Sequence, residues 1–120
     1  PTARITILVQ SDSKAILDIK GLPIEAKPSH VFSFSENGSD EIGAVWFVAK
    51  KGGYEENELG MFVDICYRYL DTHYSRDYFV NTSYCMAVDV FSGKVLRYQE
   101  IKNGKVHSAI DTTIDHFKKF

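Results

Sequence analysis

A single amphipathic segment, residues 54–71 (YEENELGMFVDICYRYLD), constrains this chain more than any other stretch. Its apolar side chains recur at steps of three and four residues, the spacing of one face of an α-helix. They are Leu59, Phe62, Val63, Cys66, Tyr67 and Leu70. Glutamates gather at the N-terminal end, where they suit the positive end of the helix dipole. We therefore predict one long helix whose apolar stripe is wide enough to cover a β-sheet.

Seven other runs are rich in β-branched and aromatic residues and are bounded by turn residues, a pattern that indicates short strands. They span residues 4–10, 15–20, 31–35, 43–50, 78–82, 85–91 and 94–101. Asn37-Gly38 separates the third run from the fourth and is a strong hairpin signal. Gly21-Leu22-Pro23 is expected to break the element before it. These short connections favour antiparallel pairing.

The C-terminal residues predict a second, shorter helix. Ser108 can cap this helix, with Asp111 three residues later, and Ile110, Ile114 and Phe117 follow at helical spacing. We expect one α+β domain over residues 1–120. Its antiparallel sheet of about six or seven strands would be covered by the long central helix and the short C-terminal helix.

The composition is that of a folded domain with nearly balanced charge. Hydrophobic residues make up 44% of the 120 residues, aromatic residues 13%, and the formal net charge is −2. This balance argues against nucleic acid as the main partner, because phosphate binding needs clustered Lys and Arg. No apolar run is long enough to span a membrane, and the first ten residues lack a signal-peptide layout. We expect a cytoplasmic protein without a membrane partner.

The two cysteines and one mid-strand acid are interpreted as structural. Cys66 lies on the helical stripe and Cys85 opens a predicted strand, which favours buried, reduced thiols. A disulfide between Cys66 and Cys85 is the alternative, since a helix and the sheet it covers can bring two cysteines together. Asp89 interrupts the apolar run CMAVDVF and is expected to face solvent or to pair with a residue such as Arg97 across the Ser92-Gly93 turn.

Pro1 is the residue for which a catalytic role is the clearest alternative to a non-catalytic protein. Its secondary amine can act as a general base, and PTARITIL resembles the start of a tautomerase-family chain. That family follows its first strand with a long helix, whereas Pro23 ends the corresponding segment here. The four histidines, His30, His73, His107 and His116, show no zinc-type spacing. We expect no metal, no cofactor and no catalytic residue, with a tautomerase-like enzyme using Pro1 as the alternative.

The long helix and the connection after it carry the candidate partner-binding surface. Tyrosine with interspersed Arg and Asp is typical of protein interfaces, and a glutamate run can attract a basic partner. The candidate residues are Glu55, Glu56, Glu58, Tyr69, Asp71, Tyr74 and Asp77. A further interpretation is that the chain is a self-associating structural or phage-type accessory protein. It would then form a homodimer through an exposed strand edge or the tyrosine surface.

From Met86 onward the sequence is MAVDVFSGKVLRYQEIKNGKVHSAIDTTIDHFKKF. A strand with an Ala-x-Asp core runs into a Ser-Gly turn, a Val-bearing strand follows, and the closing helix has Phe near its end. This section resembles the closing part of SUKH-superfamily immunity proteins, through Ala87, Asp89, Gly93, Val95, Ile110 and Phe117. The front of the chain departs from that family, because Leu22-Pro23 follows strands rather than a helix. The resemblance implies a small bacterial cytoplasmic protein that neutralises a toxin domain, often a basic one, by binding it without catalysis.

Overall fold

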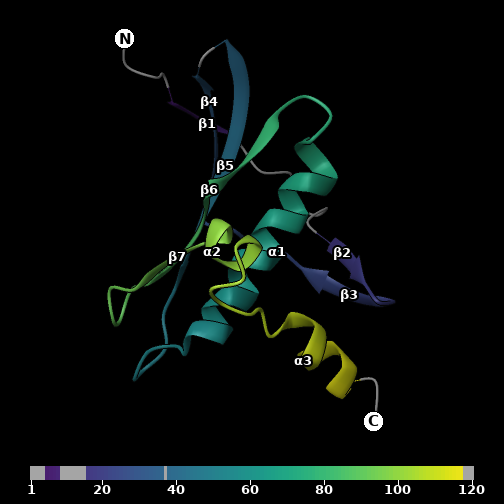
Figure 1. Ribbon diagram of the computed structural model, residues 1–120, viewed down its shortest axis with the longest axis vertical. Helices are drawn as coiled ribbons and strands as arrows, with labels where there is room; N and C mark the ends of the chain where they lie inside the picture. The colour runs from purple at the N-terminus through teal and green to yellow at the C-terminus, as the bar shows by residue number, and fades with distance from the viewer. Residues whose placement is uncertain (1–4, 9–15, 37, 118–120) are drawn as a thin grey trace.

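The computed structural model describes residues 5–8, 16–36 and 38–117, which adopt an α+β fold (Figure 1). A five-stranded sheet holds β1 (Ile5–Leu8), β4 (His30–Glu36), β5 (Ser39–Val48), β6 (Phe79–Asp89) and β7 (Val95–Arg97), in this spatial order. A separate sheet pairs β2 (Ile16–Ile19) with β3 (Leu22–Glu25), and the helices are α1 (Glu56–Tyr74), α2 (Tyr98–Lys102) and α3 (Ile110–Phe117). The predicted fold class is confirmed, whereas Pro1 lies outside the described residues.

The five-stranded sheet is mixed, so the prediction of a wholly antiparallel sheet was wrong. β4 pairs antiparallel with β1 and with β5. β5 and β6 run parallel, with Ala44 beside Cys85 and Val48 beside Asp89. Parallel neighbours need a long crossover connection, and α1 supplies it between these two strands. The central helix is therefore both the cover of the sheet and the link within it.

α1 packs its predicted stripe against one face of the sheet. Leu59, Val63, Cys66 and Leu70 are fully buried there, while the stripe's two large aromatic residues are half-buried at its margins. The helix begins and ends two to three residues later than the sequence predicts. Figure 1 shows α1, α3 and the β2–β3 hairpin on the same side of the sheet. We call this side the covered face.

Two predicted strands, residues 78–82 and 85–91, are parts of the one long strand β6. Its pairing with β5 is interrupted by a bulge, because β5 advances from Ile42 to Ala44 while β6 advances from Val80 to Cys85. The bulge lays the Tyr84 backbone over Gly43, where an added Cβ would lie 2.6 Å from the Tyr84 carbonyl oxygen. Glycine is needed at position 43 for this close approach.

The predicted strand over residues 94–101 is a strand only as far as β7. The Arg97 N–H donates to the Glu100 carboxylate at 3.0 Å, which caps the first turn of α2. Tyr98 then stacks on Tyr67 of α1, with ring centroids 4.0 Å apart. The local cap and this stacking contact outweigh the strand-like alternation of the segment.

β2 ends before Gly21-Leu22-Pro23, as the sequence predicts, but the chain then turns back in a tight hairpin that the sequence did not predict. Lys20 and Gly21 both adopt positive φ, and the Gly21 N–H donates to the Asp18 carboxylate at 2.7 Å. The turn returns the chain as β3, and Leu17 and Ile19 of β2 are buried in the core. This small sheet extends the apolar cover formed by α1.

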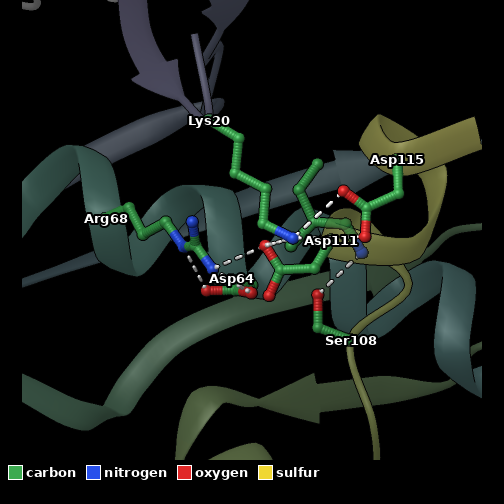
Figure 2. Close-up of polar contacts among 7 residues, drawn as sticks. Lys20, Asp64, Arg68, Ser108, Asp111 and Asp115 are labelled. Atoms are coloured by element: carbon green, nitrogen blue, oxygen red, sulfur yellow. Dashed lines mark hydrogen bonds and ion pairs between the residues drawn. The ribbon is translucent and has the colours of Figure 1, made fainter. Parts of the chain in front are cut away.

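A chain of ion pairs links the hairpin to α1 and α3 (Figure 2). Lys20 Nζ lies 3.2 Å from Asp115 Oδ1 and 3.9 Å from Asp111 Oδ1. The Arg68 guanidinium bonds Asp64 Oδ1 at 3.0 Å and lies 3.8 Å from Asp111 Oδ1. The two basic groups are thus paired with acids of the protein itself, and we interpret this cluster as structural.

The two cysteines are free thiols in the core beneath α1, which agrees with their predicted burial. Removal from water disfavours the charged thiolate. Burial therefore raises the pKa of Cys66 well above its usual range and the pKa of Cys85 to about 12. Both side chains act as small apolar groups at neutral pH.

Candidate functional site

The seven predicted partner-binding residues lie in two groups, at opposite ends of α1. Glu55, Glu56 and Glu58 lie at its N-terminal end, and the other four lie in or just beyond its last turns. Glu56 and Asp71 are about 22 Å apart along the axis, from the rise of an α-helix. The candidate residues therefore fall into two groups, and the two ends of α1 are considered separately.

The glutamates at the N-terminal end are partly occupied in starting the helix. The Glu55 N–H donates to the Glu58 carboxylate at 2.9 Å, and Lys50 Nζ lies 3.5 Å from the same carboxylate. The Glu55 N–H is the largest influence that lowers the pKa of Glu58, and Lys50 adds to it. Glu56 is exposed. This end has an ordinary capping box, so the glutamate run is explained without a partner.

Tyr69 was predicted to contact a partner but lies inside the protein. Its side chain is only 3% exposed and belongs to the main apolar cluster under α1. The ring packs against His73 and Tyr74, with centroids 5.1 and 5.9 Å away. Burial is the main cause that raises the pKa of Tyr69. A partner could reach this ring only if the core opened, so Tyr69 is removed from the candidate surface.

Asp71 and Asp77 do come together, at a solvent-open hollow beside the C-terminal end of α1. The hollow has a volume of about 640 Å³ and lies between this helix end and the turn from β4 to β5. We call it the acidic hollow, and its chemically distinctive lining residues are Asp40, Asp71, Asp77, Tyr67, Tyr78 and Arg76. Tyr74 packs edge-on against Tyr78, with centroids 6.3 Å apart, and so supports the lining.

The electrostatics of the acidic hollow favour a cation. It is lined by three carboxylates and one guanidinium, and the carbonyl end of α1 adds the negative end of the helix dipole. Among the described residues, neither Asp71 nor Asp77 forms an ion pair. Asp40 accepts a hydrogen bond from the Ser35 hydroxyl at 2.8 Å. Burial and the neighbouring Asp71 carboxylate both raise the pKa of Tyr67, so this ring stays neutral.

Asp89 has a structural role, as the sequence predicts. Of the two placements left open it takes the buried one, and its partners differ from the expected Arg97. Its carboxylate accepts the backbone N–H groups of Tyr54 at 2.8 Å, Phe91 at 2.9 Å and Ser92 at 3.3 Å. The Tyr54 N–H is the largest influence that lowers the pKa of Asp89. Arg97 instead donates to the Ser83 carbonyl oxygen at 2.6 Å. Asp89 thus joins the approach to α1 to the turn after β6.

Sequence reasoning missed a second candidate surface, the face of the five-stranded sheet opposite α1. No described element packs on it. We call it the uncovered face, and its apolar residues are Ile5, Ile7, Phe32, Phe34, Val45, Phe47, Tyr84, Met86, Val88 and Val95. The signal was present in the sequence, because several predicted strands carry large apolar residues at both alternating sets of positions, more than one covering helix can bury.

Three further observations concern metal sites, membrane-spanning helices and similarity to known proteins. Within the described part of the chain, no group of three or more His, Cys, Asp and Glu side chains is arranged to hold a metal ion. None of the described helices is both long and apolar enough to cross a membrane. Comparisons with protein-family models, with curated proteins and with solved structures found no match to this chain.

Proposed function

We propose that this chain is a protein-binding domain whose acidic hollow receives basic side chains of a partner protein. The observation that supports this most directly is the convergence of Asp71 and Asp77 with Asp40 in one solvent-open hollow. Two residues singled out by their sequence context lie there, together with a third acid, Asp40, from the start of β5. We locate the partner site at this end of α1 and leave out the glutamates of the other end.

The lining suits arginine or lysine side chains. Carboxylates supply charge-assisted acceptors, and Arg matches them in a bidentate geometry. The rings of Tyr67 and Tyr78 offer aromatic faces on which a guanidinium can stack. A volume of about 640 Å³ is larger than one side chain occupies, so the hollow can take a short basic segment.

The specific role that we propose is inhibition of a toxin domain, as in immunity proteins or antitoxins. This part of the proposal is supported by the resemblance of the closing section to SUKH-superfamily immunity proteins. The strand–turn–strand arrangement expected from Ala87, Asp89 and Gly93 corresponds to β6, its turn and β7. An inhibitor acts by occupying its partner, so the proposed role requires no catalytic group in this chain.

Titration with a basic peptide tests the hollow directly. An acetylated and amidated hexa-arginine peptide is added to ¹⁵N-labelled protein in low salt, and amide shifts are followed by NMR. We expect the largest shifts at the hollow, and we expect the D71N/D77N variant to bind about tenfold more weakly because two charges are lost. The matched control E25Q/E56Q removes two exposed carboxylates elsewhere and should bind like the wild type.

Two results would overturn the proposal. If the shifts cluster at Glu55, Glu56 and Glu58, the basic partner is recognised at the other end of α1. If D71N/D77N and E25Q/E56Q weaken binding equally, the peptide responds to net charge only. The inhibitor role is tested separately by co-expression with a toxin encoded beside this chain. Protection of the cells should be lost in D71N/D77N and kept in E25Q/E56Q.

A further inference from the structure

We propose that a second copy of this chain packs on the uncovered face, so that two five-stranded sheets meet face to face in a homodimer. The two surfaces adjoin at Phe79, which lines the acidic hollow and pairs with Glu41 on this face. The proposal does not depend on the acids of the hollow, Asp71 and Asp77, which lie in and just beyond the last turns of α1. It uses the sheet face, whereas the sequence suggested a strand edge or the tyrosine surface as the means of self-association.

Strand register places the apolar residues on one face. In β4 and β5, Phe32 pairs with Gly43 and His30 with Val45, whereas Val31 pairs with Ala44 on the covered face. β1 adds Ile5 beside Phe34 and Ile7 beside Phe32. β6 and β7 add Met86 beside Arg97 and Val88 beside Val95. Side chains directly opposite each other in a sheet share a face, so the apolar surface runs across all five strands.

The exposed area is large for a protein of this size. Five strongly exposed apolar residues of the face are Ile5 (63%), Ile7 (61%), Phe47 (48%), Val95 (48%) and Tyr84 (41%). At roughly 200 Å² for each fully exposed side chain of this size, these five alone offer on the order of 500 Å². Their half-buried neighbours add to this area. The largest apolar patch on a typical monomer covers about 300–600 Å² and is often functional.

The face carries few charges, and most of them have partners within the protein. The Arg97 guanidinium lies over the Tyr84 ring at 5.9 Å and donates to the Ser83 carbonyl oxygen. The Glu41 carboxylate accepts a hydrogen bond from the Asn81 side chain at 2.7 Å. A strongly charged partner would therefore find little to pair with here, whereas an equally apolar surface would leave these hydrogen bonds in place.

Area and composition together favour a second copy over a different protein. Two copies would remove roughly 1,000 Å² from water through these five side chains of each, and the neighbouring residues bring the total into the range of stable interfaces. Homodimer interfaces are more apolar than transient ones, and the core of an interface is depleted in charge. Both descriptions fit this face, and two sheets can pack at about 10 Å in an aligned sandwich.

The aromatic part of the face is already ordered in the single chain. Phe32, Phe34 and Tyr84 contact one another with ring centroids 5.4 to 6.4 Å apart. The bulge over Gly43 holds the Tyr84 backbone in place beneath this cluster. Little side-chain freedom is left to lose on association, which lowers the entropic cost of forming the dimer.

Sedimentation equilibrium of the wild-type chain and two variants tests this proposal. F47K places a charge on the central strand of the uncovered face, at a side chain that is half exposed. I16K makes the same change at a residue of equal exposure on β2, away from this face. We expect a concentration-dependent wild-type dimer, a dissociation constant at least about tenfold higher for F47K, and no change for I16K. Circular dichroism confirms folding of each variant, and V95K replaces F47K if the latter unfolds.

A mixture of ¹³C-labelled and unlabelled chains then locates the interface by isotope-filtered NMR. We expect intermolecular contacts among the methyl groups of Ile7, Val45, Val88 and Val95. The proposal is overturned if the wild-type chain stays monomeric at millimolar concentration. It is also overturned if I16K weakens association as much as F47K does, or if the intermolecular contacts lie elsewhere. A monomer that binds neutral phosphatidylcholine vesicles through Phe47 would identify a lipid surface as the occupant instead.

Discussion

The two faces of the five-stranded sheet are made by the same strands but have different surroundings. On the covered face, Ile42 and Ala44 of β5 are fully buried beneath α1. On the uncovered face, Phe47 of the same strand is half exposed. Both faces are rich in large apolar residues, so composition alone does not distinguish them. The difference shows that the described helices can bury only one face, and that the apolar character of the other face needs a separate explanation.

The largest expected effect is the loss of stability when an isoleucine is shortened to alanine on the covered face, compared with the same change on the uncovered face. Ile42→Ala should lower the free energy of unfolding by about 2–5 kcal/mol, because it leaves a cavity under α1. Ile7→Ala should cost less than about 1 kcal/mol in the dilute monomer, because Ile7 is already 61% exposed. Urea unfolding at low protein concentration measures both costs. Equal costs would mean that something covers the second face as well.

Gly43→Ala tests the close approach between β5 and the bulge of β6. The added Cβ would lie 2.6 Å from the Tyr84 carbonyl oxygen and 2.9 Å from the Phe32 ring. The ring can rotate away but the backbone oxygen cannot, so we expect a loss of about 1–3 kcal/mol in the free energy of unfolding. Chemical denaturation measures the loss, and the aromatic NMR signals of Tyr84 should shift. A variant with unchanged stability and an unchanged Tyr84 spectrum would contradict the bulge geometry.

The pH dependence of stability should depend on Asp89, which lies at the end of the covered face. Its folded-state pKa is lowered below the usual 3.8, so the unfolded chain binds a proton more readily. The contribution of Asp89 is therefore fully present above about pH 5 and is lost as the pH falls through the lowered folded-state pKa. We expect Asp89→Asn to be less stable than the wild type at pH 6, and the gap to narrow steadily towards pH 2.

Urea unfolding over this pH range provides the measurement. Glu56→Gln is a suitable control, because this exposed carboxylate should leave the pH profile unchanged. A constant gap between Asp89→Asn and the wild type at all pH values would show that the carboxylate's charge is unimportant and that only its shape matters.

The smallest expected effect concerns the ion pairs around Lys20. The Lys20 and Asp115 side chains are each about half exposed, so their attraction is screened by water. Lys20→Met keeps most of the side-chain stem and should change the free energy of unfolding by less than about 1 kcal/mol. The difference in the free energy of unfolding between Lys20→Met and the wild type should be smaller in 1 M NaCl than in 0.05 M NaCl, because salt screens the ion pairs. A larger loss would show that charge, rather than apolar burial, holds the β2–β3 hairpin on the helices.

Local patterns predicted the elements well. The stripe of α1 follows directly from the spacing of Leu59, Val63, Cys66 and Leu70, and the β4–β5 hairpin follows from the two strand-like runs around Gly38. The start of α3 was predicted to within two residues, because the helix begins at Ile110, and the Ser108 hydroxyl accepts the Ile110 N–H at 3.2 Å rather than the expected Asp111 N–H. Each of these features depends on residues that are close together in the chain.

Pairing between distant strands was harder to predict. The order strand, long helix, strand around α1 is the pattern of a parallel crossover, but the surrounding hairpin signals favoured an antiparallel sheet. The end of β7 was missed because the capping contact from Arg97 to Glu100 competes with an alternating pattern that suits a strand equally well. Both outcomes depend on packing against α1, which no short window of sequence contains.

The candidate site was predicted in part for the same reason. Asp71 and Asp77 were found from their tyrosine-rich context, but Asp40 joins them only because the start of β5 lies beside the end of α1. Tyr69 was misplaced because a tyrosine near the end of an amphipathic helix can point to either side. The uncovered face depends on the register of five strands and on which face the helix occupies.

The parallel pairing of β5 with β6 also has a consequence for the order of folding. The β4–β5 hairpin joins residues that are close in the chain, whereas the pairing of Ala44 with Cys85 requires closure of the long segment that contains α1. Such non-local pairing slows folding. Until it is complete, both apolar faces are open to solvent, so the folding rate should respond to substitutions along the α1 stripe more than to substitutions on the uncovered face.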